Sequence, residues 1–117
     1  MQYMCLIYAA EGHGPQPGTP EFGPFMQGYH DFTNDVREKG VLVSGEALQP
    51  TATATTVSVR DGKTITTDGP FAETKEQLGG FYLLDCKDLD EAVEWASQIP
   101  SARYGTIEVR PVVVFEE

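Results

Sequence analysis

The sequence contains little of what nucleic-acid-binding and membrane proteins require. It has 8 lysines and arginines against 18 aspartates and glutamates, a formal net charge of −10 at pH 7. A surface of this sign repels phosphate backbones and anionic lipid headgroups. No stretch approaches the roughly 20 consecutive apolar residues of a membrane-spanning helix. We therefore expect neither a nucleic-acid partner nor a membrane partner.

Histidines, cysteines and the common catalytic signatures are also scarce. The chain has 2 histidines and 2 cysteines, without the His-x-His or Cys-x-x-Cys spacing of a metal site. It contains no P-loop, no G-x-G-x-x-G and no serine nucleophile elbow. Cys5 and Cys86 fall in or beside predicted strands and resemble small core residues more than a disulfide pair. We expect no metal site and no cofactor.

What remains is the composition of one globular domain. A length of 117 residues suits a single domain over 1–117, and a hydrophobic content of 40% is ordinary for a folded chain. The first ten residues lack the basic region and the long apolar run of a signal peptide, so we expect a cytoplasmic protein.

Apolar spacing predicts strand, helix and strand in the first part of the chain. Residues 3–8 form a short continuous apolar run, typical of a strand buried on both faces. After a glycine- and proline-rich loop, helical spacing predicts a helix that begins at Pro24 and is ended by Gly40. Residues 41–48 predict the second strand.

A β-hairpin is predicted next. The threonine- and alanine-rich residues 51–56 are interpreted as a strand lead-in. Val57 and Val59 then alternate with polar residues, and Asp61-Gly62 is a strong two-residue hairpin turn. Residues 63–67 return as the partner strand.

A second strand-helix-strand unit completes the chain. Residues 81–85 predict a strand, and Asp88 with Glu91 three residues later forms a capping box at the start of a helix. Pro100 stops that helix, and residues 106–115 predict the last strand. The order β-α-β, hairpin, β-α-β is a ferredoxin-like α+β plan, βαββαβ with an antiparallel sheet and an extra β-hairpin.

The segment after the hairpin is the most distinctive. The string DGPFAETKEQLGGFYLLD, which starts at Asp68, carries more charge in its first half than a turn requires. It resembles the signature of the DGPF proteins, a branch of the YCII-related family. Two further stretches match that family, SGEAL around Glu46 and GTIEVRPV around Arg110. The resemblance covers nearly the whole chain after Val41.

The resemblance implies an assembly and leaves the activity open. An antiparallel sheet with helices on one face leaves its other face bare, and by resemblance two chains pack these faces together as a homodimer, a dimeric α/β barrel. The fold class includes cofactor-free isomerases and oxygenases, but a fold does not confer a reaction. One hypothesis is therefore a small-molecule cleft near the DGPF loop. The alternative is a regulatory protein partner, since DGPF proteins are often encoded beside extracytoplasmic-function sigma factors.

Asp68 and His30 are the candidate catalytic residues. Asp68 lies where a strand ends and a turn begins, so its carboxylate either faces a cleft as a base or caps the turn through the Phe71 or Ala72 amide. Histidine is the side-chain type most suited to proton transfer near neutral pH, and His30 lies about 90° from the apolar stripe of the first helix, at a cleft rim or on the surface. YCII-related proteins are associated with a His-Asp pair, which His30 and Asp68 would supply.

Four more residues are candidate ligand-binding groups: Glu46, Glu73, Glu76 and Arg110. Glu73 and Glu76 share a face if residues 72–77 form a helical turn, and paired carboxylates can provide an acid and a base; the alternative is a solvated pair. Alternation puts Glu108 and Arg110 on one face of the last strand. The guanidinium there binds a carboxylate, from Glu46, Asp68 or an acidic ligand, or forms a structural ion pair.

Overall fold

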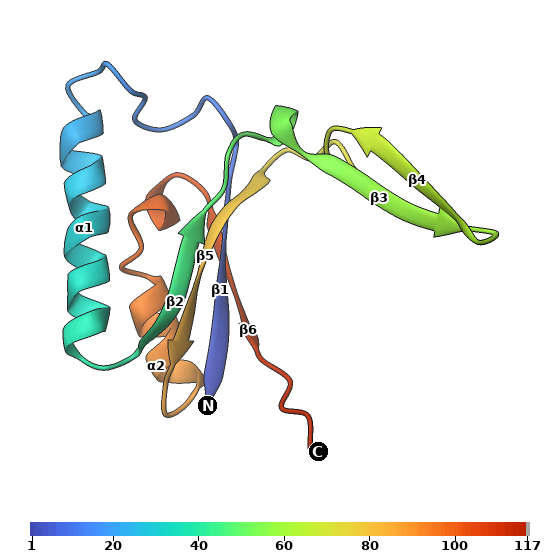
Figure 1. Ribbon diagram of the computed structural model, residues 1–117. Coiled ribbons are helices and arrows are strands. Elements are labelled where there is room, and N and C mark those ends of the chain that lie inside the picture. Colours follow the sequence, from blue (N-terminus) through green and yellow to red (C-terminus); the bar gives the residue numbers. More distant parts are fainter. Residues whose placement is uncertain (117) are drawn as a thin grey trace.

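Four antiparallel strands form the sheet on which the rest of the chain packs (Figure 1). The computed structural model describes residues 1–116. Its strands β1 (Gln2–Ala9), β2 (Leu42–Ala47), β5 (Gln77–Asp85) and β6 (Thr106–Pro111) lie in the order β2-β5-β1-β6. Each neighbouring pair runs antiparallel. This order confirms the predicted ferredoxin-like α+β fold.

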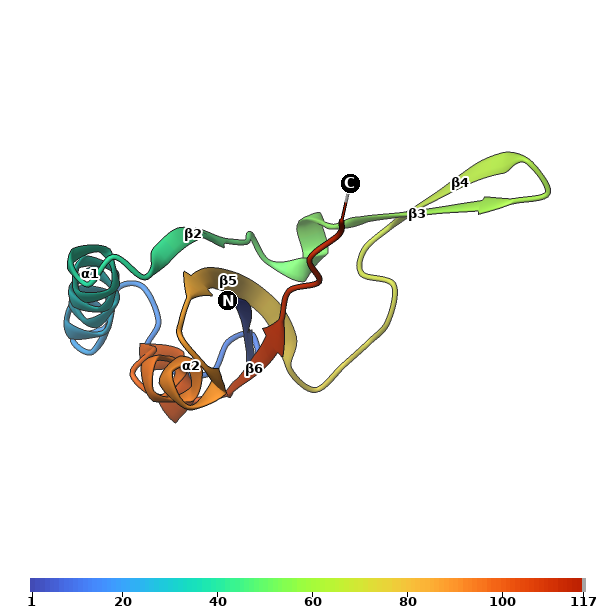
Figure 2. The same cartoon turned by 90° about the horizontal axis from the view of Figure 1, so that it is seen from below.

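Two helices cover one face of this sheet. α1 (Phe22–Glu38) follows β1, α2 (Leu89–Ala96) follows β5, and Figure 2 shows both on the same side. α1 starts two residues before Pro24, which its first turn tolerates because amides there need no helical acceptor. Gly40 ends α1 as predicted, with a φ of 74° that suits glycine.

The hydrophobic core lies between the sheet and the helices. β1 alternates: Tyr3, Cys5 and Ile7 are buried, and Met4 and Leu6 lie on the other face. The remaining core residues are Phe32, Val36, Val41, Leu84, Cys86, Ala92, Ala96 and Ile99. In the single chain, the prediction that β1 is buried on both faces holds for one face only, because Met4 and Leu6 on the other face are only partly buried.

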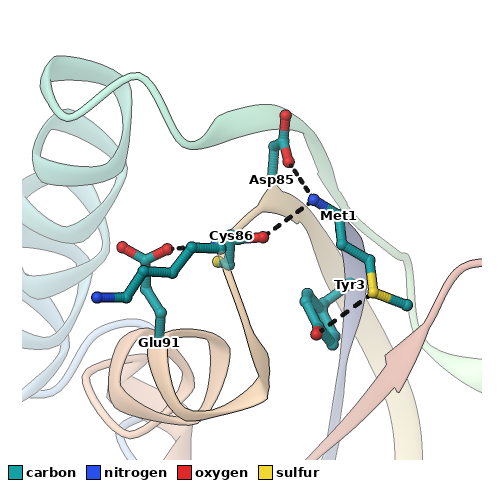
Figure 3. A network of polar contacts seen from close by, with 6 residues as sticks. Met1, Tyr3, Asp85, Cys86 and Glu91 are labelled. Atoms are coloured by element: carbon teal, nitrogen blue, oxygen red, sulfur yellow. Dashed lines mark hydrogen bonds and ion pairs between the residues drawn. The ribbon is translucent and has the colours of Figure 1, made fainter.

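Polar contacts join the N-terminus to the end of β5 (Figure 3). The Met1 amino group donates to the Asp85 carboxylate and to the Cys86 carbonyl, each across 3.0 Å. The same end of the sheet leads directly into α2. The chain terminus therefore anchors the strand that β1 and β2 share.

The start of α2 follows the predicted capping pattern closely. The Asp88 carboxylate accepts a hydrogen bond from the Glu91 amide at 2.9 Å. The Glu91 carboxylate returns to the amide of Lys87, at 2.7 Å, one residue before the expected Asp88. The helix ends before Pro100, which instead begins η2 (Pro100–Arg103).

A two-stranded hairpin stands away from the body of the protein. β3 (Thr55–Arg60) and β4 (Lys63–Asp68) form their own sheet, which Figures 1 and 2 show projecting on the side opposite the helices. The turn is confirmed: Asp61 and Gly62 have φ values of 52° and 75°, the left-handed pair of a type I′ hairpin. The radius of gyration is 16.4 Å, against roughly 13 Å for a compact domain of about this size. We call this hairpin the arm.

One strand starts earlier and one ends earlier than predicted. β5 begins at Gln77, inside the segment predicted as a loop, and its Gly80 lies so close to β2 that an added Cβ would be 2.7 Å from the Glu46 carbonyl oxygen. β6 ends at Pro111 because its neighbour β1 begins at Gln2. The expected continuation to residue 115 has no partner strand there.

The expectation of a strand lead-in over residues 51–56 holds only for the end of the segment, because β3 begins at Thr55. The segment starts with η1 (Thr51–Thr53), and β3 follows it. Thr53 bonds the Pro50 carbonyl through both its amide, at 2.9 Å, and its hydroxyl, at 2.7 Å. Such local bonding competes with a strand ladder.

Candidate functional site

A cleft opens between α1 and the β2 edge of the sheet. Its volume is about 690 Å³, and its walls come from α1, β2, β5 and the N-terminal loop (residues 10–21). This volume lies within the range of about 300 to 1,000 Å³ that small-molecule sites occupy. Its sheet residues Ile7, Leu42 and Tyr82 belong to or pack against the core under the helices, so the cleft opens on the helix-covered face of the sheet.

One face of α1 forms the first wall. Its lining residues form two adjacent rows in which each residue is four positions from the next, and two such rows share one helical face. They are Phe25, Tyr29, Thr33 and Arg37 in one row and Met26, His30 and Asn34 in the other. The Phe25 and Tyr29 rings meet edge to face, with centroids 5.4 Å apart. This arrangement makes the wall aromatic toward the N-terminal end of α1 and polar toward its C-terminal end.

A close approach of backbone and ring shapes the sheet wall. Gly45 of β2 faces the Tyr82 ring, and a Cβ at Gly45 would lie 2.8 Å from that ring. Tyr82 in turn packs edge to face on Phe32, with centroids 5.0 Å apart. The bulge or close approach that sequence indicated at Gly45 is therefore real, and it leaves the Tyr82 ring space next to the strand that a side chain at this position would fill.

Two hydrogen-bonded hydroxyl pairs lie along the base of the cleft. The Thr33 and Tyr82 hydroxyls are 2.8 Å apart, and the Tyr29 and Ser101 hydroxyls are 2.6 Å apart. Burial raises the pKa of the Tyr29 phenol above its usual value. Burial therefore favours the neutral phenol of Tyr29, and the Tyr29–Ser101 pair is a hydrogen-bonding group suited to orient a ligand without attracting a counter-ion.

Donor groups line the rim. His30 and Arg37 both line the cleft from α1 and are exposed. Arg37 donates to the Asn34 side-chain oxygen at 3.0 Å, which leaves the Asn34 amide nitrogen and the rest of the guanidinium for a ligand. Among the described residues that line the cleft, Arg37 is the one lysine or arginine, and it lies in the same lining as the carboxylates of Glu11 and Glu46.

The N-terminal loop closes one end of the cleft. Glu11 and His13 line it from this loop. The Glu11 carboxylate accepts a hydrogen bond from the Thr51 amide at 2.8 Å, and its own amide donates to the Gln77 side chain at 2.9 Å. Both partners stand at the base of the arm, so the loop is tied to the segments that carry the arm.

The two predicted catalytic residues lie in different places. His30 lines the cleft, at the rim position that its helical angle allowed. Asp68 is the last residue of β4, opposite Thr55, and is exposed. It is not among the residues that line the cleft. Within residues 1–116 its carboxylate accepts no hydrogen bond, from the Phe71 or Ala72 amide or elsewhere.

Glu73 and Glu76 are not on a common helical turn. Residues 72–77 adopt an irregular path into β5. Two side-chain contacts hold that path: Thr74 donates to the Glu76 carbonyl at 2.7 Å, and Gln77 donates to the Thr74 carbonyl at 2.6 Å. Glu73 is exposed, whereas Glu76 accepts a hydrogen bond from the Thr106 hydroxyl at 3.0 Å.

Arg110 forms the ion pair that sequence offered as an alternative. Its guanidinium is 2.9 Å from the Glu108 carboxylate, and both side chains are largely exposed. Such a pair contributes about 0–1 kcal/mol to stability. Glu46 lies on β2 at the opposite edge of the sheet, roughly 14 Å away across three strand spacings, so the two do not meet within one chain. With Tyr8, Glu76 and Thr106, the pair lines a second, open depression of about 520 Å³.

Glu46 borders the main cleft, although by register it pairs with Phe81 on the face away from the helices.

The sequence did not predict the hydroxyl pairs at the base of the cleft. The spacing of Tyr29, Thr33 and Arg37 on α1 carried part of the signal, because it marks one helical face. Nothing local indicates Ser101 or Tyr82 as their partners.

Metal and thiol chemistry have no visible site in the described part of the chain. No group of three or more His, Cys, Asp or Glu side chains is arranged there to hold a metal ion. Cys5 and Cys86 are free and buried, as predicted. Burial raises the pKa of the Cys5 thiol to about 11, so the nucleophilic thiolate is disfavoured. None of the helices in residues 1–116 has the length and apolar character to cross a membrane.

Known proteins resemble this chain over nearly its full length. Residues 1–116 match the family model of the YCII-related domain. An uncharacterized protein of Rhizobium meliloti (strain 1021) is 48% identical over 118 aligned residues, which cover 99% of this chain and 95% of the relative.

Proposed function

The chain belongs to the YCII-related family, and we propose that it binds a small organic molecule in the cleft between α1 and the sheet. The observation that carries this proposal is the cleft itself. It combines a volume of about 690 Å³ with aromatic walls and a few polar groups that point to one space. Small-molecule sites have this composition, because apolar walls supply affinity and a few polar groups supply orientation.

The rim suggests the kind of ligand. His30, Asn34 and Arg37 offer hydrogen-bond donors along one edge of the cleft, while Phe25, Met26 and Leu42 offer apolar surface in the same cleft. A molecule with an apolar or aromatic body and a carboxylate or carbonyl acceptor fits both parts. A guanidinium prefers such planar acceptors, so Arg37 is the proposed anchor.

His30 is the proposed acid-base group if the ligand is transformed, because it lines the cleft and an imidazole can both accept and donate a proton. Asp68 stays a proposed second catalytic residue on the grounds of the family resemblance. Asp68 is exposed at the base of the arm and outside the cleft lining, so the roles of His30 and Asp68 can be tested separately. A cleft that works alone requires His30 and not Asp68.

A screen of aromatic and aliphatic carboxylic acids by thermal shift tests the binding proposal. A ligand at 100 times its Kd stabilises the folded state by about 2.7 kcal/mol, which raises the Tm by several degrees in a domain of this size. Arg37→Gln should abolish the shift. The matched control is Arg103→Gln, because Arg103 is exposed on η2 and outside the cleft lining. No shift with any acid, or equal shifts in both variants, would overturn the proposal.

Two further variants distinguish a site in the cleft from a site at the DGPF loop. If Asp68→Asn loses the ligand-induced shift while His30→Asn keeps it, the site lies at the DGPF loop and not in the cleft. The reverse result supports the cleft. Both variants change exposed side chains, so neither should disturb folding.

We also propose that two chains pack as a homodimer through the sheet face away from the helices. By register, that face presents a central apolar stripe: Met4, Leu6, Tyr8, Leu78, Phe81 and Leu83. A stripe of this kind on a sheet face is a common interaction surface. The two free buried thiols fit a reducing compartment, so we further propose a cytoplasmic location.

A second candidate function is that of a non-catalytic regulatory partner of an extracytoplasmic-function sigma factor. The observation that favours it is Phe71 in the DGPF loop, whose side chain is 90% exposed. An aromatic anchor of this kind suits a protein interface. Titration of a purified sigma factor of this class with the native chain and with Phe71→Ser tests it: binding that the substitution weakens at least tenfold supports the partner role, and no binding excludes it.

A further inference from the structure

The arm has too little contact with its own chain to account for its order. Val57 and Val59 are each 60% exposed, and Ile65 is 48% exposed. The arm forms a separate two-stranded sheet. A two-stranded hairpin on its own is at best marginally stable in water. Apolar strand residues left in solvent also invite edge-to-edge association.

The arm and the bare sheet face lie on the same side of the molecule. Figures 1 and 2 show the arm projecting away from α1 and α2, on the side of the sheet that the helices leave open. The two apolar surfaces, Val57 and Val59 on the arm and the central stripe on the sheet, are therefore available to one and the same partner. A partner on the sheet face would lie on the same side of the molecule as the arm.

The two faces of the arm differ. Cross-strand pairs share a face, and the register pairs Val57 with Thr66 and Val59 with Thr64. Ser58 and Ile65 are paired on the opposite face. The Val57/Val59 face thus carries two valines and the methyl groups of two threonines. It is the more continuous apolar surface of the two.

The length of the arm matches the width of a facing sheet. β3 has six residues, which span about 20 Å at 3.3 Å per residue. Two sheets packed face to face lie about 10 Å apart, and four strands are roughly 14 Å across. An arm of this length, starting at the edge of one sheet, reaches over the edge of the sheet that faces it.

Charge and symmetry favour a second copy as that sheet. The tip of the arm carries Arg60 and Lys63 beside Asp61, a locally positive end on a chain of net charge −10. A second copy is therefore an acidic partner for the tip. In a two-fold dimer the same surface is used by both chains, so each arm reaches the other chain. The apolar face of the arm and the apolar stripe of the sheet are then covered in both chains.

We propose that the arm of each chain lies on a second copy of the same chain, with its Val57/Val59 face packed against the partner. This inference rests on the proposed homodimer and adds to it a second area of contact. It also supplies the missing support for the arm, because the hairpin becomes part of a larger packed layer in the dimer.

The test compares the dimer dissociation constants of full-length variants by sedimentation equilibrium. The Val57→Thr/Val59→Thr double variant keeps β-branched side chains and strand preference but removes apolar surface. We expect its dissociation constant to rise at least tenfold. Ile65→Thr makes the same chemical change on the opposite face, and its dissociation constant should stay within threefold of the native value.

A third variant separates the arm from the sheet. Leu6→Lys places a charge in the central stripe and should abolish the dimer, whatever the arm does. If Leu6→Lys abolishes the dimer while the double variant binds like the native chain, the arm proposal fails and the homodimer stands. If the native chain is monomeric at every concentration, both fail, and ligand binding in the cleft is untouched.

Hydrogen exchange on the native chain gives an answer that needs no substitution. Amides of Ser58 and Ile65, a cross-strand pair at a hydrogen-bonded position of the hairpin ladder, should exchange more slowly as the chain concentration rises through the dimer dissociation constant, because the partner then covers the arm. Exchange that does not change with concentration, in a chain that does dimerise, would overturn the proposal.

Discussion

The Glu11 carboxylate accepts a hydrogen bond from the Thr51 amide, with 2.8 Å between oxygen and nitrogen. Forty positions separate the two residues. Glu11 also donates its amide to Gln77 at 2.9 Å. One residue of the N-terminal loop thus contacts both chain segments that lead into and out of the arm and the DGPF loop, at the mouth of the cleft.

Loss of this contact should loosen the cleft mouth. Glu11→Ala removes the acceptor for the Thr51 amide, at a cost of about 1 kcal/mol in the free energy of unfolding. Urea denaturation measures that cost, and hydrogen exchange should show faster exchange of the Thr51 amide. Glu21→Ala, in the same loop, is the control, because residues 1–116 give its carboxylate no capping bond to α1. Equal effects of the two variants would show that the contact does not order the loop.

Gly45 should not tolerate a side chain. In Gly45→Ala the new Cβ meets the Tyr82 ring at 2.8 Å and the Phe81 carbonyl at 3.0 Å. Overpacking of this kind costs about 1–3 kcal/mol. The matched control is Gly79→Ala in β5, where the nearest atom to the new Cβ is the Ile7 carbonyl oxygen at 4.0 Å. A comparison of urea midpoints should therefore separate the two; if Gly79→Ala is the more destabilising, the account of the cleft wall is wrong.

The Thr33–Tyr82 hydroxyl pair should behave as a coupled unit. Thr33→Val leaves the part-buried Tyr82 hydroxyl without its partner across 2.8 Å, at a cost of about 1–2 kcal/mol. With Tyr82→Phe already present, Thr33→Val should cost less, since no hydroxyl then remains unpaired. A double-mutant cycle in chemical denaturation measures the coupling, expected near 1 kcal/mol. A coupling of zero would mean that water replaces the lost partner.

Stability should fall in alkaline solution partly because of Cys5. Burial raises the pKa of this thiol from 9.0 to about 11 in the folded chain. A group whose pKa is raised on folding favours the folded state while it is protonated. This contribution is complete below about pH 9 and is lost as the pH rises toward about 11.

The measurement is the free energy of unfolding from about pH 8 to about pH 10. Cys5→Ala lacks the thiol, so its stability should fall less steeply than that of the native chain over this range. Identical slopes would mean that other groups, such as the Tyr29 phenol with its raised pKa, account for the whole alkaline loss. In the folded chain, Cys5 should also resist alkylation near neutral pH.

The turns and helix ends that depend on short-range interactions were predicted correctly from the sequence. The Asp61-Gly62 turn needs two adjacent residues that accept a positive φ, and the start of α2 needs a side-chain acceptor at Asp88. Gly40 at the end of α1 belongs to the same class. Each of these contacts spans four residues or fewer, so the local sequence contains both partners. Periodicity then placed the helices and strands in their correct order.

Strand ends and the site depended on partners far away in sequence. β5 begins at Gln77 because β1 is there to pair with it, and β6 ends where β1 runs out. The hydroxyl pairs at the cleft base join residues 49 and 72 positions apart. No periodicity reports such a contact.

The sequence by itself therefore determined the fold class, the order of the elements, the exposed hairpin turn and the buried state of both cysteines. Only the tertiary structure decided that His30 lines the cleft while Asp68 does not, and that Arg110 pairs with Glu108 on an open face. The reason is physical: alternation and helical spacing assign a side chain to a face, but the packing of α1 on the sheet determines which face encloses a cavity.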